Sequence, residues 1–475
     1  MIRALAAAFA AAAGLVLLSG CAAPSAALPR DAADAELLRE HPQRLIVVAV
    51  ANPRERVVTQ AGSTLASYNA SQRYGAGSEA RSVLEAIERE HGLREIAAWP
   101  ISALHVHCVV LEIAPGAERD QVLAALARDP RVELAQPLQD FDTLAAPEAA
   151  RALPASPASV AAYNDPYVDL QRGFAELDAV DAHQLARGQG VRIALIDTGV
   201  DTTHPDLQGR IAATRDFVDG NAAQFDADRH GTEVAGVIAA VANNRQGIVG
   251  IAPQAMLSVY KACWQRSAAD GGGARCNSFT LAQALGASID DGARIINLSL
   301  GGPDDPLLTR LVGNALGRGR IVIGAMPPDG RPHGFPTGIA GVIAVDSTTD
   351  STTDRAKDGT PDAVLRAPGR DILTLEPGGR YDYSSGSSLA AAHASAVAAL
   401  LLEAAPSQDA AAVRSALERG RSGASINACE ALATLFAPTR THRQEQDGRG
   451  PCASRRGPTG PPVEPVDERP RGAMQ

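Results

Sequence analysis

Residues 191–199 read Val-Arg-Ile-Ala-Leu-Ile-Asp-Thr-Gly, a short run of β-branched and apolar residues that ends in an aspartate and a Thr-Gly turn. Similar apolar runs recur further along the chain, at 295–298, 320–323 and 342–345. Stretches of helical spacing lie between and after them, at 232–242, 281–289 and 389–404. Apolar strands that alternate with helices predict an α/β fold, with a parallel sheet covered by helices on both faces.

Asp197 ends the first of these strands. Catalytic groups of open parallel sheets gather at the carboxyl ends of the strands, which is where this carboxylate would lie. Two further motifs rich in small residues follow, His-Gly-Thr from His230 and Gly-Ser-Ser-Leu-Ala-Ala-Ala-His around Ser388. A serine hydroxyl becomes a good nucleophile when a histidine takes its proton, and a carboxylate holds that histidine in the right tautomer. Asp197, His230 and Ser388 are therefore the candidate catalytic residues.

The order Asp, His, Ser along the chain distinguishes one of the three unrelated folds that carry this triad. Together with Asp-Thr-Thr-His-Pro-Asp-Leu at 201–207, the motifs resemble the subtilisin-like serine proteases (subtilases, peptidase S8). The resemblance implies a subtilisin-like fold and a serine endopeptidase that acts on protein or peptide substrates and needs no cofactor for its chemistry. Within the His230 and Ser388 motifs, two positions depart from the family pattern: Glu233 stands in place of a histidine, and Ala392 stands in place of a proline.

The segment Asn-Leu-Ser-Leu-Gly-Gly at 297–302 resembles the family strand that pairs with bound substrate. The resemblance implies that Ser299, Leu300 and Gly301 bind substrate through backbone hydrogen bonds.

The run at 324–330 is discordant with the family. Family members carry an asparagine there, whose side-chain amide is the second oxyanion donor, and Pro328 occupies the equivalent position. Proline has neither a side-chain donor nor a backbone N–H. Two alternatives to an active protease therefore stay open: a weakly active or inactive pseudoprotease that binds extended peptides, and a surface-anchored scaffold whose triad is a relic.

Three oxygen-bearing residues occupy positions like those of a family calcium site, namely Asp165, Asp206 and Asn244. Carboxylate, amide and carbonyl oxygens are ligands that suit Ca²⁺. The resemblance thus implies a structural calcium ion, and calcium is the only cofactor expected.

An alternating pattern precedes the protease-like region. It predicts strands at 44–50, 105–113 and 132–135 and helices at 79–91 and 117–128, which suggests a small ferredoxin-like α+β sandwich. This region resembles the inhibitory propeptide (inhibitor I9 type) of subtilases, most closely at 129–137. The resemblance implies that the chain carries its own intramolecular inhibitor.

The N-terminus predicts export. Arg3 precedes an apolar run at 4–18, and the following Leu-Ser-Gly-Cys resembles the bacterial lipoprotein box, which implies lipidation of Cys21. Ala22 favours the outer membrane, with the protein facing the periplasm or the cell surface; an ordinary secretory signal is the alternative. The expected organisation is a signal peptide at 1–20, a tether at 21–44, the propeptide-like domain at 45–141, a linker and processing zone at 142–162, the peptidase domain at 163–438 and a disordered tail at 439–475.

Export also permits disulfides. Cys263 and Cys276 flank a glycine-rich excursion and are expected to form a bridge, and Cys429 with Cys452 is a second candidate pair. The net charge of −10 argues against a nucleic-acid partner, whose usual footprint is a basic face.

Overall fold

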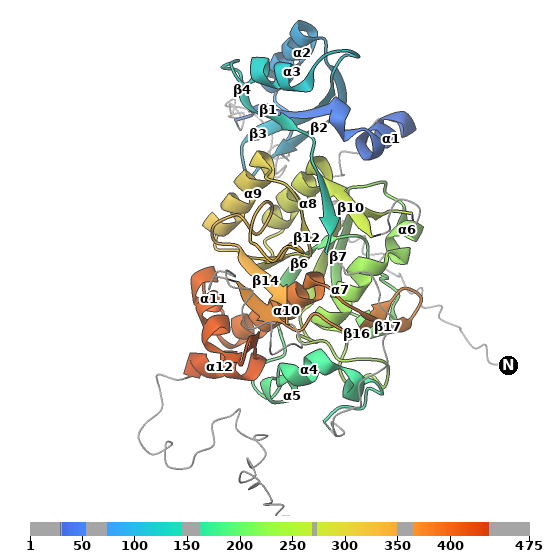
Figure 1. The fold of residues 1–475 in the computed structure, drawn as a ribbon, viewed down its shortest axis with the longest axis vertical. Helices are drawn as coiled ribbons and strands as arrows, with labels where there is room; N and C mark the ends of the chain where they lie inside the picture. Colours follow the sequence, from blue (N-terminus) through green and yellow to red (C-terminus); the bar gives the residue numbers. More distant parts are fainter. Residues whose placement is uncertain are drawn as a thin grey trace, which may run out of the picture.

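The protein is described by a computed structural model that covers residues 29, 31–53, 74–144, 162–267, 273–348 and 364–436. Figure 1 shows a small N-terminal sandwich (blue to cyan) stacked on a larger α/β domain (green to red). Cys21, Cys452 and the predicted tail lie outside the described residues, so the lipidation site, the second bridge and the tail stay predictions.

A seven-stranded sheet forms the centre of the α/β domain. Its strand order is β15-β14-β13-β11-β6-β8-β7, and every neighbouring pair is parallel. The strands are β6 (Arg192–Asp197), β7 (Ile211–Asp216), β8 (Met256–Lys261), β11 (Ile295–Leu298), β13 (Ile321–Ala325), β14 (Ile343–Ser347) and β15 (Leu365–Ala367). The predicted α/β class with a parallel sheet is confirmed.

Side-chain alternation along β6 explains why both faces of the sheet are covered. Ile193 and Leu195 pack into the cluster that contains the helices α7 and α10, whereas Ala194 and Ile196 face the cluster of α8 and α9. The longer helices of this domain are α7 (Arg229–Ala239), α8 (Ser278–Asp290), α9 (Pro306–Gly317), α10 (Ser387–Ala404), α11 (Ala410–Arg419) and α12 (Ala428–Phe436). Helix α10 is long and apolar enough to cross a membrane by composition, but 83% of it is buried, so it is the core helix of this domain.

The remaining elements of the domain are short. They include α4 (Arg172–Glu176), α5 (Ala179–Ala182), α6 (Ala222–Ala227), β16 (Ile372–Glu376), β17 (Arg380–Ser384), β18 (Arg421–Ser422) and β19 (Ser425–Ile426).

The N-terminal sandwich is an antiparallel sheet of order β2-β3-β1-β4 with two helices on one face. Its elements are β1 (Leu45–Ala51), α2 (Ser78–His91), β2 (Arg94–Ile101), β3 (Val106–Glu112), α3 (Arg119–Leu126) and β4 (Val132–Pro137). All five predicted elements are present, and β2 is an additional strand. Alternation again divides β1, since Val48 packs beneath α2 and α3 and Val47 faces the α/β domain.

The second face of this sheet packs on α8 and α9. Trp99 of β2 meets Phe279 of α8 edge to face, with ring centroids 4.9 Å apart. Gln136 of β4 is buried, donates to Asp305 at 2.7 Å and accepts from the backbone N–H of Leu307 at 2.9 Å. The sandwich is therefore fixed to the α/β domain by both apolar packing and buried hydrogen bonds.

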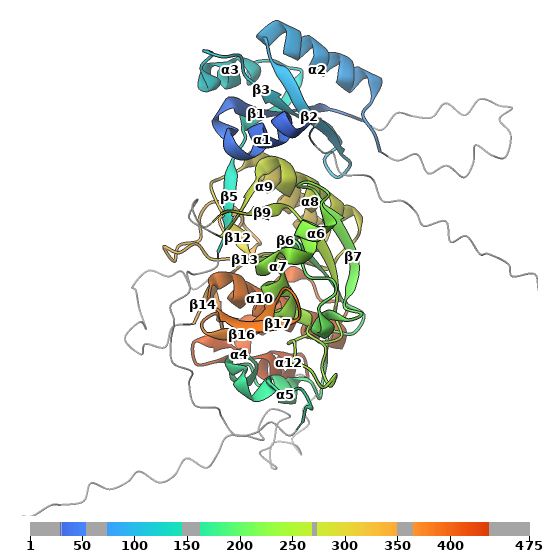
Figure 2. The same ribbon diagram turned by 90° about the vertical axis from the view of Figure 1, so that its right-hand side faces the viewer.

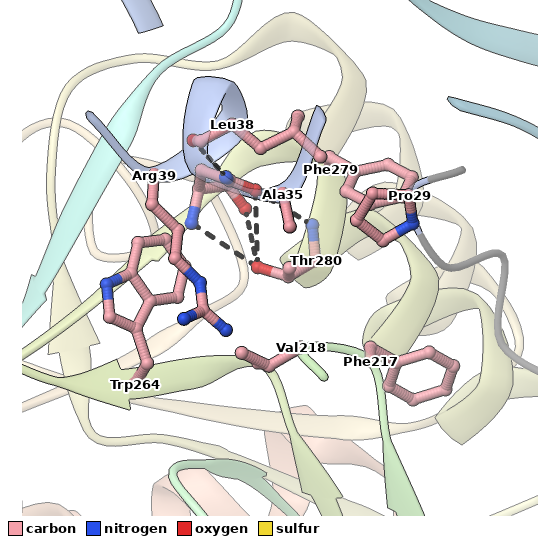
Figure 3. A pocket seen from close by; sticks show the side chains of 10 residues that line it. Pro29, Ala35, Leu38, Arg39, Phe217, Val218, Trp264, Phe279 and Thr280 are labelled. Atoms are coloured by element: carbon pink, nitrogen blue, oxygen red, sulfur yellow. Dashed lines mark hydrogen bonds between the residues drawn. The ribbon is translucent and has the colours of Figure 1, made fainter. Parts of the chain in front are cut away.

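The predicted tether is wrong for part of its length, because it contains the helix α1 (Ala32–Glu40). Asp31 caps this helix by accepting a hydrogen bond from the N–H of Asp34 at 2.9 Å. Figure 3 shows α1 lying on the α/β domain, with Leu38 near Phe279 and Arg39 over the ring of Trp264, 5.6 Å from its centroid. The helix is held in place by burial of Leu38 against the α/β domain. This tertiary contact could not be predicted from a segment rich in Ala and charged residues.

The predicted linker is wrong at its start. Residues 142 and 143 belong to β5 (Asp140–Thr143), a strand that runs down from the sandwich to the α/β domain (Figure 2). It is part of a second sheet, of order β12-β5-β10-β9, with β9 (Cys263–Gln265), β10 (Ala274–Asn277) and β12 (Leu300–Gly301). The rest of the predicted linker, 145–161, lies outside the described residues.

Candidate active site

Two of the three predicted catalytic side chains are in direct contact. Asp197 is the last residue of β6 and is fully buried, and His230 is the second residue of α7 and only 5% exposed. The Nδ1 atom of His230 lies 2.6 Å from Oδ1 of Asp197. Oδ1 also accepts from the backbone N–H of Thr198 at 2.7 Å. These contacts fix the imidazole in one orientation.

Ser388 is the second residue of α10, which packs against α7. It is 1% exposed, and its hydroxyl donates to the carbonyl oxygen of Ser299 at 3.0 Å. The Nε2 atom of His230 is buried and has no hydrogen-bond partner among the described residues. The serine hydroxyl thus points toward Ser299 in this structure, while the histidine keeps one ring nitrogen available for a proton.

The surroundings of His230 adjust its pKa. Burial lowers the pKa, but the Asp197 carboxylate and then Glu233 act in the opposite direction, so the pKa is raised above that of a free histidine. Glu233, the residue that departs from the family pattern, is buried and pairs with Arg229 at 2.7 Å. Burial is the largest influence on Glu233 and raises its pKa, although His230 and Arg229 act in the opposite direction. A second acidic group therefore lies close to the imidazole.

A buried ion pair lies beneath the site. Lys261, at the end of β8, contacts Asp228, and both side chains are fully buried. Asp228 also accepts from the backbone N–H of Gly199 at 2.8 Å, just beyond Asp197. Through Asp228, the start of α7 is therefore held to both β8 and the loop after β6. Removal of either partner of the ion pair would leave an uncompensated buried charge.

A segment of the chain itself lies along the predicted substrate-binding strand. β5 pairs antiparallel with β12, with Thr143 opposite Leu300 and Asp142 opposite Gly301. Its other edge pairs antiparallel with β10. Strand addition of this kind is how extended peptides bind to exposed sheet edges. Of the predicted substrate-binding residues, Leu300 and Gly301 hold β5 by backbone pairing.

Leu144 follows β5 and reaches the predicted nucleophile. Its N–H donates to the carbonyl oxygen of Ser299 at 3.3 Å, and its carbonyl oxygen accepts from the backbone N–H of Ser388 at 3.4 Å. The third predicted substrate-binding residue thus also contacts the segment. A carbonyl carbon of the protein's own backbone is held next to the serine.

Phe141 fills an apolar site beside this path. It is buried and packs edge to face on Phe335, with ring centroids 5.4 Å apart. A Cβ atom added at Gly302 would lie 2.4 Å from the Phe141 ring, so glycine is what lets the ring fit against the backbone. The site therefore accepts a large apolar side chain three residues before Leu144.

Pro328 lies on the loop after β13 and is exposed. The neighbouring Asp329 uses its carboxylate within the same loop, accepting from the N–H of Arg331 at 3.1 Å and contacting Nε2 of His333 at 2.8 Å. Neither residue supplies a donor to the Leu144 carbonyl in this structure, as far as the described residues go.

The three predicted calcium ligands lie together. Asn244 donates its side-chain amide to Asp206 at 2.7 Å, and its backbone N–H donates to Asp165 at 3.1 Å. Asp206 is fully buried and accepts from the N–H of Ile248 at 2.9 Å. The oxygen chemistry of this cluster fits a calcium ion, although an ion would require an oxygen of Asn244 where its amide nitrogen now donates.

Cys263 and Cys276 form a disulfide between β9 and β10. Cys276 lies directly opposite Phe141 in the β10–β5 pairing. The disulfide therefore links the two strands of the hairpin formed by β9 and β10, and β10 is the strand that pairs with β5.

Sequence analysis missed the segment that pairs with β12 and reaches Ser388. Residues 140–144 read Asp-Phe-Asp-Thr-Leu, and their alternation of polar and apolar residues is a strand signal. Arg266 and Arg275, which lie next to this segment, belong to no recognisable sequence motif and were not predicted as site residues.

Comparisons with known proteins all identify subtilisin-like proteases as similar to this chain. The family model described as Subtilase family matches residues 188–440. Thermitase of Thermoactinomyces vulgaris is 35% identical over 259 residues, which cover 54% of this chain and 90% of that protein. Subtilisin BL of Lederbergia lenta is 36% identical over 239 residues, covering 50% of this chain and 85% of that protein. The crystal structure of fervidolysin from Fervidobacterium pennivorans has a TM-score of 0.58 at 22% identity, covering 82% of this chain and 60% of that one, and supports the fold.

Proposed function

This chain belongs to the subtilase family of serine endopeptidases, and we propose that it cleaves peptide bonds with Ser388 as nucleophile, His230 as general base and Asp197 as the group that orients the imidazole. The strongest support is the 2.6 Å contact between His230 Nδ1 and Asp197 Oδ1. With its proton on Nδ1, the imidazole offers Nε2 as the acceptor. The serine proton then has a buried base to move to.

The reaction proceeds in two halves. Ser388 Oγ turns from Ser299 to the imidazole, loses its proton to Nε2 and bonds to the substrate carbonyl carbon. His230 returns this proton to the leaving amine, and an acyl-enzyme forms. Water, deprotonated by the same histidine, then releases the acid and restores the serine.

Among the described residues, the backbone N–H of Ser388 at the start of α10 is the one clear donor for the oxyanion of each intermediate. Pro328 supplies none. We therefore expect slow turnover. An inactive peptide-binding protein is the second candidate function, and Pro328 is the observation that favours it.

We also propose that the N-terminal sandwich is an inhibitory propeptide and that the enzyme cuts its own chain between Leu144 and Ala145. Support comes from β5, which lies along the cleft as an extended substrate would, and from the Leu144 carbonyl beside Ser388. If Cys21 carries a lipid, this cut separates the anchor and the inhibitor from the catalytic domain.

Calcium is a structural part of the proposal. Asp165, Asp206 and Asn244 would hold the ion, which would stabilise the loop after α7 and take no part in the chemistry.

A fluorophosphonate probe tests the main proposal. Full-length wild type is expected to react covalently at Ser388 and to release a C-terminal fragment, whereas Ser388→Ala should stay unlabelled and uncut. A folded wild-type chain that neither labels nor cuts would favour the peptide-binding alternative.

A further inference from the structure

Two arginines lie beside β5, the strand that pairs with the predicted substrate-binding strand β12. Arg275 of β10 is directly opposite Asp142 of β5, and its Nε lies 3.7 Å from Oδ1 of that aspartate. Arg266, which follows β9, places a guanidinium nitrogen 3.8 Å from the same oxygen. The disulfide between Cys263 and Cys276 holds the hairpin that carries both arginines. Two positive charges thus face one position of the bound segment.

The contact defines a subsite for a substrate side chain. If the bond after Leu144 is the one that is cut, Asp142 is the third residue before the cut bond. The Asp142 side chain is 54% exposed, so this position is not a site where an apolar side chain would be buried. The Arg275 side chain is only 31% exposed, and its Nε is buried with no hydrogen-bond partner among the described residues. A donor of the enzyme is therefore available to a carboxylate at this position.

We propose that Arg275 and Arg266 make this cleft select substrates with Asp or Glu three residues before the cut bond. The inference rests on the proposed endopeptidase function and names its substrate class: an extended peptide with an acidic residue at that position, a large apolar residue before it, and leucine at the cut. The chain has a net charge of −10, so a local pair of arginines beside the cleft is a distinct attraction for acidic peptides.

Asp140, two residues earlier, does not define an equivalent acidic subsite. Its carboxylate lies 3.6 Å from Arg275, but burial raises the pKa of Asp140 to about 6: together with Asp142 and Glu40, burial outweighs Arg275 and Arg266, which both lower the pKa. The environment of Asp140 therefore opposes a charge, whereas Asp142 meets two arginines at the surface. The selectivity is expected at the position of Asp142 alone.

Peptide hydrolysis measures this selectivity. The substrates are fluorogenic peptides with the sequence of residues 140–144 followed by alanine, carrying Asp, Asn or Lys at the position of Asp142, and the enzyme is the self-processed full-length protein. Because half-exposed ion pairs contribute modestly, we expect kcat/KM to be about two- to fivefold higher for Asp than for Asn, and lower again for Lys. About 0.5 M salt should reduce the preference, since exposed charges are screened.

Variants assign the preference to the arginines. The double variant Arg275→Gln with Arg266→Gln should lose the discrimination between Asp and Asn, and Arg275→Glu with Arg266→Glu should prefer Lys. Arg192→Gln is the matched control, because Arg192 lies at the opposite, amino end of β6 and is exposed. Equal hydrolysis of the three peptides by wild type would overturn the inference while leaving the endopeptidase function intact.

A second readout does not need turnover. In the full-length Ser388→Ala chain, Asp142→Asn, Arg275→Gln and their combination are compared by thermal unfolding. The two changes should be non-additive by about 1–2 °C, because each removes the same contact. Additive shifts in Tm would overturn the inference, whether or not any peptide is cleaved. Failure to cleave every peptide would instead count against the proposed endopeptidase function.

Discussion

The backbone N–H of Ser388 donates to the carbonyl oxygen of Leu144 across 3.4 Å. In the proposed mechanism that N–H supports the oxyanion, so the Leu144 carbonyl would occupy the position of the substrate carbonyl. We predict that wild-type protein yields a C-terminal fragment that begins at Ala145, and that Ser388→Ala stays intact. N-terminal sequencing or intact mass of the fragment checks this. A fragment that begins further into 146–162 would mean that β5 is held in the cleft without being the processed segment.

The missing oxyanion donor predicts a gain of function. Pro328→Asn is expected to raise turnover by up to about 100- to 1000-fold, which is the cost of losing the corresponding donor in subtilisin itself. The rate of fluorophosphonate labelling and the rate of peptide hydrolysis are the measurements. Asp329→Ala is the matched control, because the carboxylate of Asp329 already contacts Arg331 and His333 in its own loop. An unchanged rate in a folded Pro328→Asn variant would show that another group supports the oxyanion.

Glu233 predicts a shift in the pH dependence of catalysis. Its negative charge helps to raise the pKa of His230, and the histidine must be neutral to act as the base. Glu233→Gln should therefore lower that pKa and move the acidic limb of the kcat/KM profile to lower pH. Glu233→Asp, which keeps the charge, should keep the limb near its wild-type position. If both variants give the wild-type profile, Glu233 has no electrostatic effect on the base.

The contact of Gln136 with Asp305 predicts a specific loss of stability. Gln136→Ala removes the side-chain acceptor of the buried Leu307 N–H, and an unsatisfied buried group costs about 1–3 kcal/mol. Asp305 loses one donor but keeps those of Ser278 and Leu308, so its share of the loss should be small. Gln139→Ala is the control, because Gln139 makes an exposed side-chain contact with Asp304 at 3.3 Å. Thermal unfolding of the full-length Ser388→Ala chain compares the two. Equal effects would mean that Gln136 does not help to dock the sandwich.

Calcium is expected to stabilise the loop after α7. Adding Ca²⁺ to the chelator-treated full-length Ser388→Ala chain should raise its Tm, with about 2.7 kcal/mol of stabilisation at a hundredfold excess over Kd. Asn244→Ala should weaken this response. If the Tm is the same with chelator and with Ca²⁺, the cluster is held by its hydrogen bonds and binds no calcium ion.

The sequence was most informative where one local pattern determines one element. The run at 191–196 became β6 with Asp197 at its carboxyl end, because a strand buried on both faces has to be apolar throughout. The position of β5 could not be predicted in the same way. Its partners in β10 and β12 lie more than a hundred residues away, so its pairing depends on tertiary contacts. The helix α1 was missed for a related reason, since its stability comes from burial of Leu38 against another domain and not from its own periodicity.

Strand β5 joins the N-terminal sandwich to the α/β domain in one continuous chain, and this determines how strongly the two stay associated. While the bond after Leu144 is intact, the proposed inhibitor and the catalytic domain are one molecule, and the pairing of β5 with β12 does not depend on protein concentration. After the proposed cut, the same contacts become an equilibrium between two chains that obeys mass action. A high concentration of the two chains would keep them associated, and dilution would separate them. Dilution then acts as the trigger that opens the cleft, without any further chemical step.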